Sequence, residues 1–201
     1  MKRLFLALVL GGLALACQAA DLATDIAARL ADAPLLRGQF EQKKSLAGFK
    51  QALVSSGDFL LWRDHGLSWH TRTPFDSRLT LTRHGITQTQ GATTLKMDAK
   101  KEPGLLLAND ILFALLSGDV SLLAQRFHMS GKLVGAEGWQ LRLTPTDAAL
   151  TKVFKNIELS GARFVQDIRL EDQNGDLTAI RFSQTKQGPA VTPEEVKNFA
   201  D

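Results

Sequence analysis

The chain has 201 residues, with 24 Lys and Arg against 21 Asp and Glu, a formal net charge of +3 and a hydrophobic fraction of 44%. It contains one cysteine and no tyrosine, and no block of Lys and Arg is long enough to predict a nucleic-acid surface. This length fits one domain with a substantial core, and a single cysteine excludes an intrachain disulfide.

The N-terminus predicts a cleavable export signal. Lys2 and Arg3 precede an apolar stretch at 4–15, which is too short to span a bilayer because a spanning helix needs about 20 apolar residues. Small residues follow, and we place the cut after Ala19. Loss of the signal, 1–19, removes Lys2 and Arg3, so 24 − 2 = 22 basic residues face 21 acidic ones in a nearly neutral exported domain, 20–201.

The position of Cys17 leaves an alternative open. A cysteine at the end of an export signal can be a lipoprotein acylation site, although Ala14 stands at −3 where such sites usually have an aliphatic residue. A cut after Ala19, or alternatively after Ala20, would leave no cysteine, and hence no thiolate nucleophile or thiolate metal ligand.

The first predicted element after the signal is a helix over residues 21–32. Leu22, Ile26 and Leu30 recur every four residues and form one apolar stripe. Asp32 and Pro34 end the helix. A helix with one apolar face has to cover another element.

Alternation of apolar and polar residues then predicts a β-meander over 36–98. Phe59 and Leu61 share one face of a strand, Trp69 and Thr71 share a face of the next, and Leu79 and Leu81 share another. Short strands punctuated by glycines and Pro74 indicate antiparallel pairing.

Residues 104–126 interrupt the strands with a helical pattern. This segment is apolar on nearly every side, and Asp119 has the position of an N-cap for a second short helix. A helix that is apolar all round is normally buried on all sides, so one reading is a core helix. The other is a lid that packs one face on the sheet and the other on a removable ligand, and that moves when the ligand binds.

Strands resume from Phe127 to Phe182. Asn174-Gly175 predicts a hairpin with a type I′ turn. At the C-terminus, Thr192, Pro193 and Glu195 form a capping-box pattern that predicts a short exposed helix.

No motif in the sequence predicts catalysis. The four histidines, at 65, 70, 84 and 128, show no zinc-ligand spacing, and there is no G-x-S-x-G elbow and no phosphate loop. We therefore expect no enzyme, no metal site and no cofactor, and we keep a lipid or glycan hydrolase as a minor alternative.

The ordered motifs resemble the outer-membrane lipoprotein carrier family, LolA. The residues that carry the resemblance are Phe40-Glu41-Gln42, the strand 57–63 ending in Arg63, then Leu67-Ser68-Trp69 and Pro74. The leucine-rich segment 104–126 stands where that family has its lid helices. The resemblance covers most of the exported chain.

The resemblance implies a mainly β fold with helices: an open, incomplete antiparallel β-barrel covered by a helical lid. It implies a periplasmic carrier that takes an acylated lipoprotein or a lipid-linked small molecule from an inner-membrane donor transporter complex to an outer-membrane acceptor. The expected cavity residues are Phe40, Phe59, Leu61, Arg63, Trp69, Leu79, Leu81, Leu106, Ile111, Leu112, Leu115 and Leu116.

Arg63 is the expected latch of the lid. It shares the parity of Phe59 and Leu61, and an arginine on an apolar face needs acceptors because an unpaired buried charge is very costly. We expect those acceptors to be carbonyls at the end of a lid helix, and the family's strand-end arginine implies the same role. The simpler alternative is a solvent-facing Arg63 paired with Asp64.

Departures from the family pattern indicate that the cargo differs from that of the family. Asp64 stands where the family has proline, and His84-Gly85-Ile86 replaces an Asp-Gly turn. These changes favour a side branch that serves another lipid-linked product, such as an acylated pigment. The alternative from a different class is a membrane-anchored acceptor, similar to LolB, acylated at Cys17.

Overall fold

The computed structural model describes residues 22–98, 111, 113–114, 116–188 and 190–199. They form an antiparallel sheet of eleven strands in the order β6-β5-β4-β3-β2-β1-β11-β10-β9-β8-β7. The strands are β1 (Leu35–Ser45), β2 (Leu53–Trp62), β3 (Gly66–Thr73), β4 (Ser77–Thr82), β5 (Gly85–Gln90), β6 (Thr93–Asp98), β7 (Phe127–Val134), β8 (Gly138–Pro145), β9 (Phe154–Gly161), β10 (Val165–Asp172) and β11 (Leu177–Gln187).

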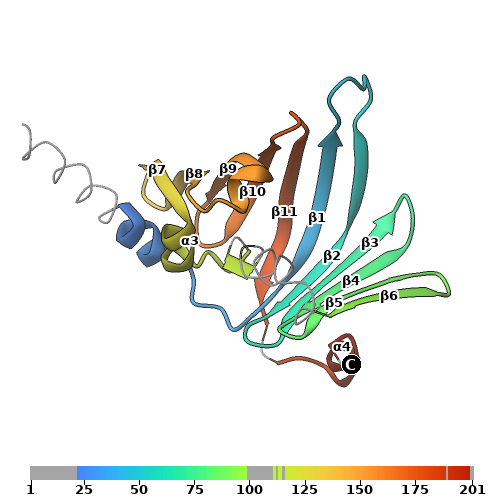
Figure 1. Ribbon diagram of the computed structural model, residues 1–201. Helices are drawn as coiled ribbons and strands as arrows, with labels where there is room; N and C mark the ends of the chain where they lie inside the picture. Colours follow the sequence, from blue (N-terminus) through green and yellow to red (C-terminus); the bar gives the residue numbers. More distant parts are fainter. Residues whose placement is uncertain (1–21, 99–110, 112, 115, 189, 200–201) are drawn as a thin grey trace, which may run out of the picture.

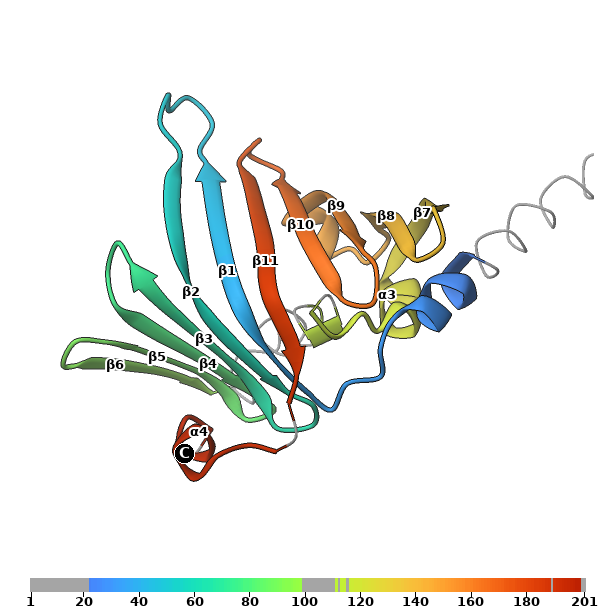
Figure 2. The same cartoon turned by 180° about the vertical axis from the view of Figure 1, so that it is seen from behind.

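The sheet consists of two meanders that meet at the first and last strands. β1 to β6 follow one another in space as in sequence, and β7 to β11 do the same. β1 pairs with β11 at the centre, where Phe40 lies opposite Phe182. The sheet curves strongly but does not close, since β6 and β7 remain its two edges (Figure 1, Figure 2). The predicted mainly β, open antiparallel fold is confirmed.

Helical segments lie at the ends and in the middle of the chain. Residues 22–29 are helical, as are the described residues of 111–117, followed by α3 (Val120–Arg126), the 3₁₀ turn η1 (Leu150–Lys152) and α4 (Pro193–Lys197). The Asp119 carboxylate accepts from the Leu122 N–H at 3.0 Å and caps α3, as predicted. The lid assignment itself stays a prediction.

The C-terminal helix follows the predicted capping box. The Thr192 hydroxyl accepts from the Glu195 N–H at 3.2 Å, and the Glu195 carboxylate accepts from the Thr192 N–H at 2.7 Å. Arg37 of β1 donates to both Glu195 oxygens, each at 2.6 Å, and to the Ala190 carbonyl at 2.7 Å. This bidentate pair lowers the pKa of Glu195 to about 2 and fastens α4 to the outer side of the sheet.

The β10–β11 hairpin forms where predicted, but its turn is not type I′. A type I′ turn needs positive φ at both central residues. Gly175 has φ +86°, whereas Asn174 does not have a positive φ. The reason is Asp172, whose carboxylate accepts from the N–H groups of Asn174 at 2.8 Å and Asp176 at 3.0 Å and builds a longer loop.

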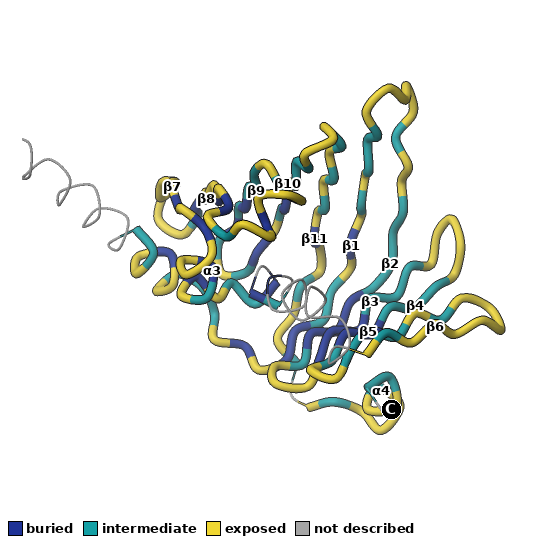
Figure 3. Tube along the Cα trace, in the orientation of Figure 1, coloured by how far each residue is buried: buried dark blue, intermediate teal, exposed yellow. Residues whose placement is uncertain are grey.

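The core runs along the inner face of the sheet and includes buried residues of β7 to β10 as well as the end of the sheet where β1 begins. A row of paired apolar residues crosses six strands there, because every second residue of a strand faces the same side. The row is Leu36, Leu61, Leu67, Leu81, Ile86 and Met97. Figure 3 shows buried stretches at this end and in the part of the sheet formed by β8 to β10, with exposed residues at the hairpin tips.

Candidate functional site

Four aromatic rings form a cluster on the inner face at the middle of the sheet. Phe40 stacks on Trp69 with ring centroids 3.8 Å apart, and Phe182 meets Phe59 edge-on at 5.2 Å. Trp69 and Phe182 are also edge-on, at 6.1 Å. The cluster joins β1, β2, β3 and β11, so it fixes the central strands relative to one another and gives the inner face a large apolar floor.

A hollow of about 540 Å³ lies at the end of β2, and none of the four rings belongs to its lining. Its apolar wall includes Leu30, Leu61, Phe113 and Leu122, so it lies between the N-terminal helix, the end of β2 and the helical residues before and within α3. Charged and polar side chains lie on the same lining: Asp32, Arg63, Asp64, His65, Arg83 and Asp119. A lining that combines apolar and charged side chains suits an amphiphile that has an acyl chain and a polar head.

Arg63 lies in the turn after β2 and contacts the chain just beyond the N-terminal helix. Its guanidinium pairs with the Asp32 carboxylate and donates to the Ala33 carbonyl at 3.3 Å. Its backbone N–H donates to the Pro34 carbonyl at 2.9 Å. Among the described residues, the acceptors are therefore at 32–34 and not at the end of the 104–126 helices, where they were expected. The side chain is 42% exposed, so solvent can compete for it.

The alternative pairing of Arg63 with Asp64 is wrong. Asp64 has φ +65° and its carboxylate accepts from Arg83 at 2.8 Å instead. The left-handed backbone at Asp64 turns its side chain toward the β4–β5 turn. His65 stacks flat on Trp62, with ring centroids 3.5 Å apart and a 6° interplanar angle.

Of the described residues predicted to line a cavity, Leu61 and Arg63 line the hollow, and the others pack elsewhere on the sheet or in the helical segment before α3. Phe40, Phe59, Leu61, Leu81, Ile111 and Leu116 are buried, and Trp69 and Leu79 are half-buried. Leu106, Leu112 and Leu115 lie outside the described residues. Burial of Ile111 and Leu116 agrees with a helix that packs on the core; whether it also moves stays a prediction.

The predicted site lacks several residues that the structure places there, including Phe113 and Asp32 at the hollow and Phe182 in the aromatic cluster. Phe182 has the parity of Ile180 on a predicted strand, and this signal could have placed it on the inner face. Asp32 was assigned only as a helix stop signal.

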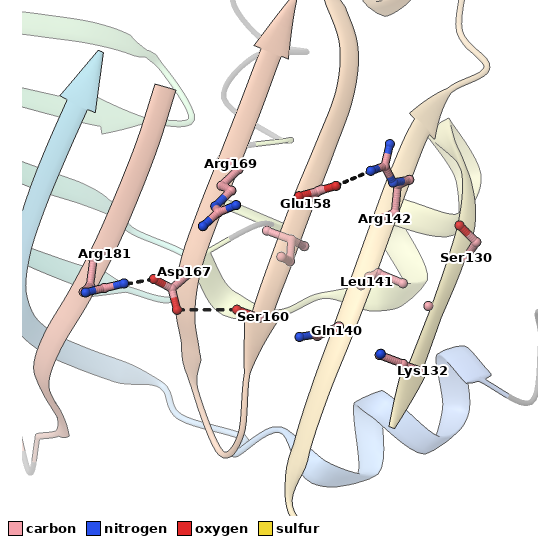
Figure 4. A pocket seen from close by; sticks show the side chains of 12 residues that line it. Ser130, Lys132, Gln140, Leu141, Arg142, Glu158, Ser160, Asp167, Arg169 and Arg181 are labelled. Atoms are coloured by element: carbon pink, nitrogen blue, oxygen red, sulfur yellow. Dashed lines mark hydrogen bonds and ion pairs between the residues drawn. The ribbon is translucent and has the colours of Figure 1, made fainter. Parts of the chain in front are cut away.

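A second hollow, on the outer face of β7 to β11, has different chemistry (Figure 4). Its lining is largely charged: Arg142 pairs with Glu158, and Arg181 donates to Asp167 at 3.1 Å. Such a lining would leave an acyl chain facing ions, so this hollow is not a site for apolar cargo.

Two kinds of feature are absent from the part of the chain that the structure describes. No group of three His, Cys, Asp or Glu side chains there is arranged to hold a metal ion. No helix there is long and apolar enough to cross a membrane.

Comparisons with known proteins agree with the resemblance read from the motifs. The family described as outer membrane lipoprotein carrier protein LolA-like matches residues 14–187. An outer-membrane lipoprotein carrier protein of Pseudomonas fluorescens is 27% identical over 169 residues, which cover 81% of this chain and 76% of that protein.

Similar solved structures are more distant. A LolA superfamily protein from Nitrosomonas europaea has a TM-score of 0.49 at 10% identity and covers 91% of this chain and 97% of its own. The lipoprotein LppX of Mycobacterium tuberculosis has a TM-score of 0.46 at 7% identity, covering 87% and 97%. The Pseudomonas aeruginosa MucA/MucB complex has a TM-score of 0.46 at 17% identity, covering 89% and 61%.

The family match spans most of the chain, including all eleven strands of the sheet. Its description is that of a carrier and not of an enzyme, which confirms the expectation that the chain is not an enzyme. The protein therefore belongs to the LolA-like family of outer membrane lipoprotein carrier proteins.

Proposed function

We propose that this protein binds the acyl chains of a lipoprotein or of a lipid-linked small molecule on the inner face of its sheet. It carries them through the periplasm from an inner-membrane donor complex to an outer-membrane acceptor. The observation that supports this most is the hollow at the end of β2, whose lining combines apolar and charged side chains.

The physical requirement is replacement of bilayer contact. An acyl chain gives up about 0.8 kcal/mol for each CH₂ that leaves the membrane, so transfer needs apolar surface of comparable extent. Leu61 and Phe113 border the hollow, and the Phe40–Trp69 stack extends the apolar inner face beyond it. An open sheet can offer this surface, because its interior is not sealed by a closing strand pair.

Arg63 gives the site a means of release. Its bonds to Asp32 and Ala33 hold the segment after the N-terminal helix against the end of β2. A cargo headgroup that accepts from the same guanidinium competes with those bonds. Binding and closure are then alternatives for one side chain, and the carrier can be loaded and emptied without a chemical step.

The decisive experiment is lipid extraction from protein purified out of its native periplasm, followed by mass spectrometry. Acylated material at close to one molecule per protein is expected. Delipidated protein titrated with a fluorescent fatty acid should then recover binding. Failure of both measurements would contradict the carrier function.

The acceptor alternative rests on Cys17, which lies outside the described residues. Mass spectrometry of the mature N-terminus separates the two functions. A free Ala20 or Asp21 supports the soluble carrier, whereas a diacylated Cys17 supports a membrane-anchored acceptor.

A further inference from the structure

The β1–β2 hairpin exposes large apolar side chains at its tip. Phe49 is 72% exposed, Leu53 62% and Val54 54%. In Figures 1 and 2 this hairpin projects beyond the neighbouring turns of the sheet. The tip lies at the opposite end of the strands from the hollow, so its exposed residues are not part of the candidate cargo site.

The exposed groups surround the tip on both faces. Leu53 lies opposite Lys44 on the inner-face parity of Phe40, whereas Val54 lies opposite Lys43 on the outer-face parity. Phe49 stands at the end, after a turn in which its N–H donates to the Leu46 carbonyl at 3.0 Å. Gly48 supplies the positive φ of that turn, +82°.

The hairpin is basic as well as apolar. Between Gln42 and Gly57 the sequence has three lysines, Lys43, Lys44 and Lys50, and no acidic residue. The acidic residues of the adjacent β10–β11 turn are engaged: Asp176 accepts from the Ala47 N–H at 2.8 Å, and Asp172 accepts within its own turn. The bond to Asp176 also holds the tip in place before any partner arrives.

We propose that the β1–β2 tip is a membrane-docking element that inserts Phe49 and its apolar neighbours among the headgroups of an anionic bilayer, with the lysines on the phosphates. A bilayer fits this tip better than a protein partner does, because it can surround a hairpin whose two faces are both apolar. Lysines beside the inserted residues match an anionic lipid surface. The proposal goes beyond the carrier function, since it concerns where the protein docks and not what it holds.

The chain offers a matched pair of phenylalanines for the test. Phe75, in the β3–β4 turn, is 71% exposed, nearly the same as Phe49, but the two arginines of its hairpin are engaged: Arg72 pairs with Asp58, and Arg78 donates to Ser68 at 3.2 Å. Wild type, Phe49→Ser and Phe75→Ser are purified from the periplasm with identical N-termini. Each is sedimented with vesicles of phosphatidylcholine alone and of phosphatidylcholine with phosphatidylglycerol.

Wild type should bind the vesicles that contain phosphatidylglycerol more strongly, and added salt should weaken the binding. Phe49→Ser should lower the partition coefficient about tenfold and Phe75→Ser less than about twofold. Lys43→Gln with Lys50→Gln should remove most of the preference for phosphatidylglycerol. Absence of wild-type binding, equal losses in both serine variants, or no loss in Phe49→Ser would each overturn the proposal.

Fatty-acid titration keeps this result separate from the carrier function. Phe49→Ser should bind a fluorescent fatty acid in vesicle-free solution as wild type does, because Phe49 does not line the hollow. Loss of fatty-acid binding together with vesicle binding would overturn an independent docking role for the tip. Normal vesicle docking without any fatty-acid binding would instead contradict the carrier function.

Discussion

Arg63 connects the end of β2 to a segment thirty residues earlier in the chain. Its guanidinium contacts Asp32 and Ala33, while its own backbone N–H is held by Pro34. A half-exposed ion pair contributes about 1 kcal/mol or less to stability. The position therefore suits a contact that opens during a working cycle better than one that holds the fold together.

Replacing Arg63 by leucine should separate loading from release. Arg63→Leu removes the bonds to 32–33 and keeps apolar bulk, so fatty-acid binding should remain within about threefold of wild type. Transfer to an outer-membrane acceptor should slow by about tenfold, because the competing acceptor bonds are gone. Transfer from labelled, loaded protein is the measurement.

Arg83→Leu is the control for that variant. Arg83 also borders the hollow and is paired with Asp64, but it does not contact the segment after the N-terminal helix. Wild-type transfer by Arg63→Leu, or an equal loss in Arg83→Leu, would contradict the latch.

Glu195 makes stability depend on pH. Its pKa is lowered from 4.5 to about 2 by the Arg37 guanidinium, so the ion pair stabilises the fold fully above pH 4.5. That contribution is lost as pH falls toward about 2. Between pH 5 and 3, Glu195→Gln should therefore lose less thermal stability than wild type, by about 1 kcal/mol.

Thermal unfolding followed by circular dichroism at a series of pH values checks this expectation. Glu194→Gln, one residue earlier in α4, should follow the wild-type curve, because Glu194 makes no ion pair with the described residues. A Glu195→Gln curve parallel to wild type would show that the pair contributes nothing.

Local residue chemistry was predictable and long-range pairing was not. Thr192 and Glu195 are three residues apart, so their capping box is visible in the sequence. Arg37 and Glu195 are separated by 158 positions, and no local pattern relates them. The alternation along β2 predicted that Arg63 lies near the inner face. Its acceptors at 32–33 belong to a distant part of the chain, so the local pattern could not identify them.

At the scale of elements, the helical segment before β7 forms part of the wall of the hollow. Phe113 lines it, and α3 begins at the Asp119 cap beside it. The apolar circumference of 104–126 predicted burial of this segment, and Ile111 and Leu116 are buried. A helix that is apolar on all sides can be covered either by the rest of the protein or by bound cargo. The sequence pattern is the same in both cases, so it could not show whether the segment is a lid.

A charge at Phe113 should abolish cargo binding and leave the sheet intact. Phe113 is half-buried, so Phe113→Glu places a carboxylate in the hollow without filling a fully closed core position. Fatty-acid affinity should fall at least about tenfold, and the β signal in circular dichroism should be unchanged.

Phe164→Glu is the matched change, because Phe164 is also half-buried but does not line the hollow. It should keep fatty-acid affinity near wild type. Equal loss of affinity in both variants, or unfolding by Phe113→Glu, would indicate that Phe113 is an ordinary core residue.

The whole molecule is built on an open sheet, and the unpaired backbone groups of its edge strands could pair with another chain. β6 carries the exposed Lys96 on one edge, and β7 carries Lys132 on the other. Edge lysines oppose pairing with a second copy, because adding a strand would bury or crowd their charge. Alternation predicted antiparallel strands and the family resemblance implied an open sheet, but which strands form the edges depends on the β1–β11 pairing, which leaves no local pattern.

We expect the exported protein to be a monomer, and removal of an edge lysine to promote self-association. Lys96→Val should increase the dimeric or larger fraction in sedimentation velocity runs. Lys186→Val is the control, since Lys186 is equally exposed but lies on β11, whose two sides are both paired. Similar association of the two variants would show that added surface hydrophobicity, and not the edge, is responsible.

The pairing of the first strand with the last has a consequence for the order of folding. β1 pairs with β2 on one side, but its partner on the other side is β11, residues 177–187, so the two meanders cannot be joined before that strand has been made. A ribosome or a translocation pore that releases the chain from its N-terminus therefore holds an incomplete sheet until β11 has emerged. The export that we propose would benefit from this order, because the central seam of the sheet closes only after both meanders have been made.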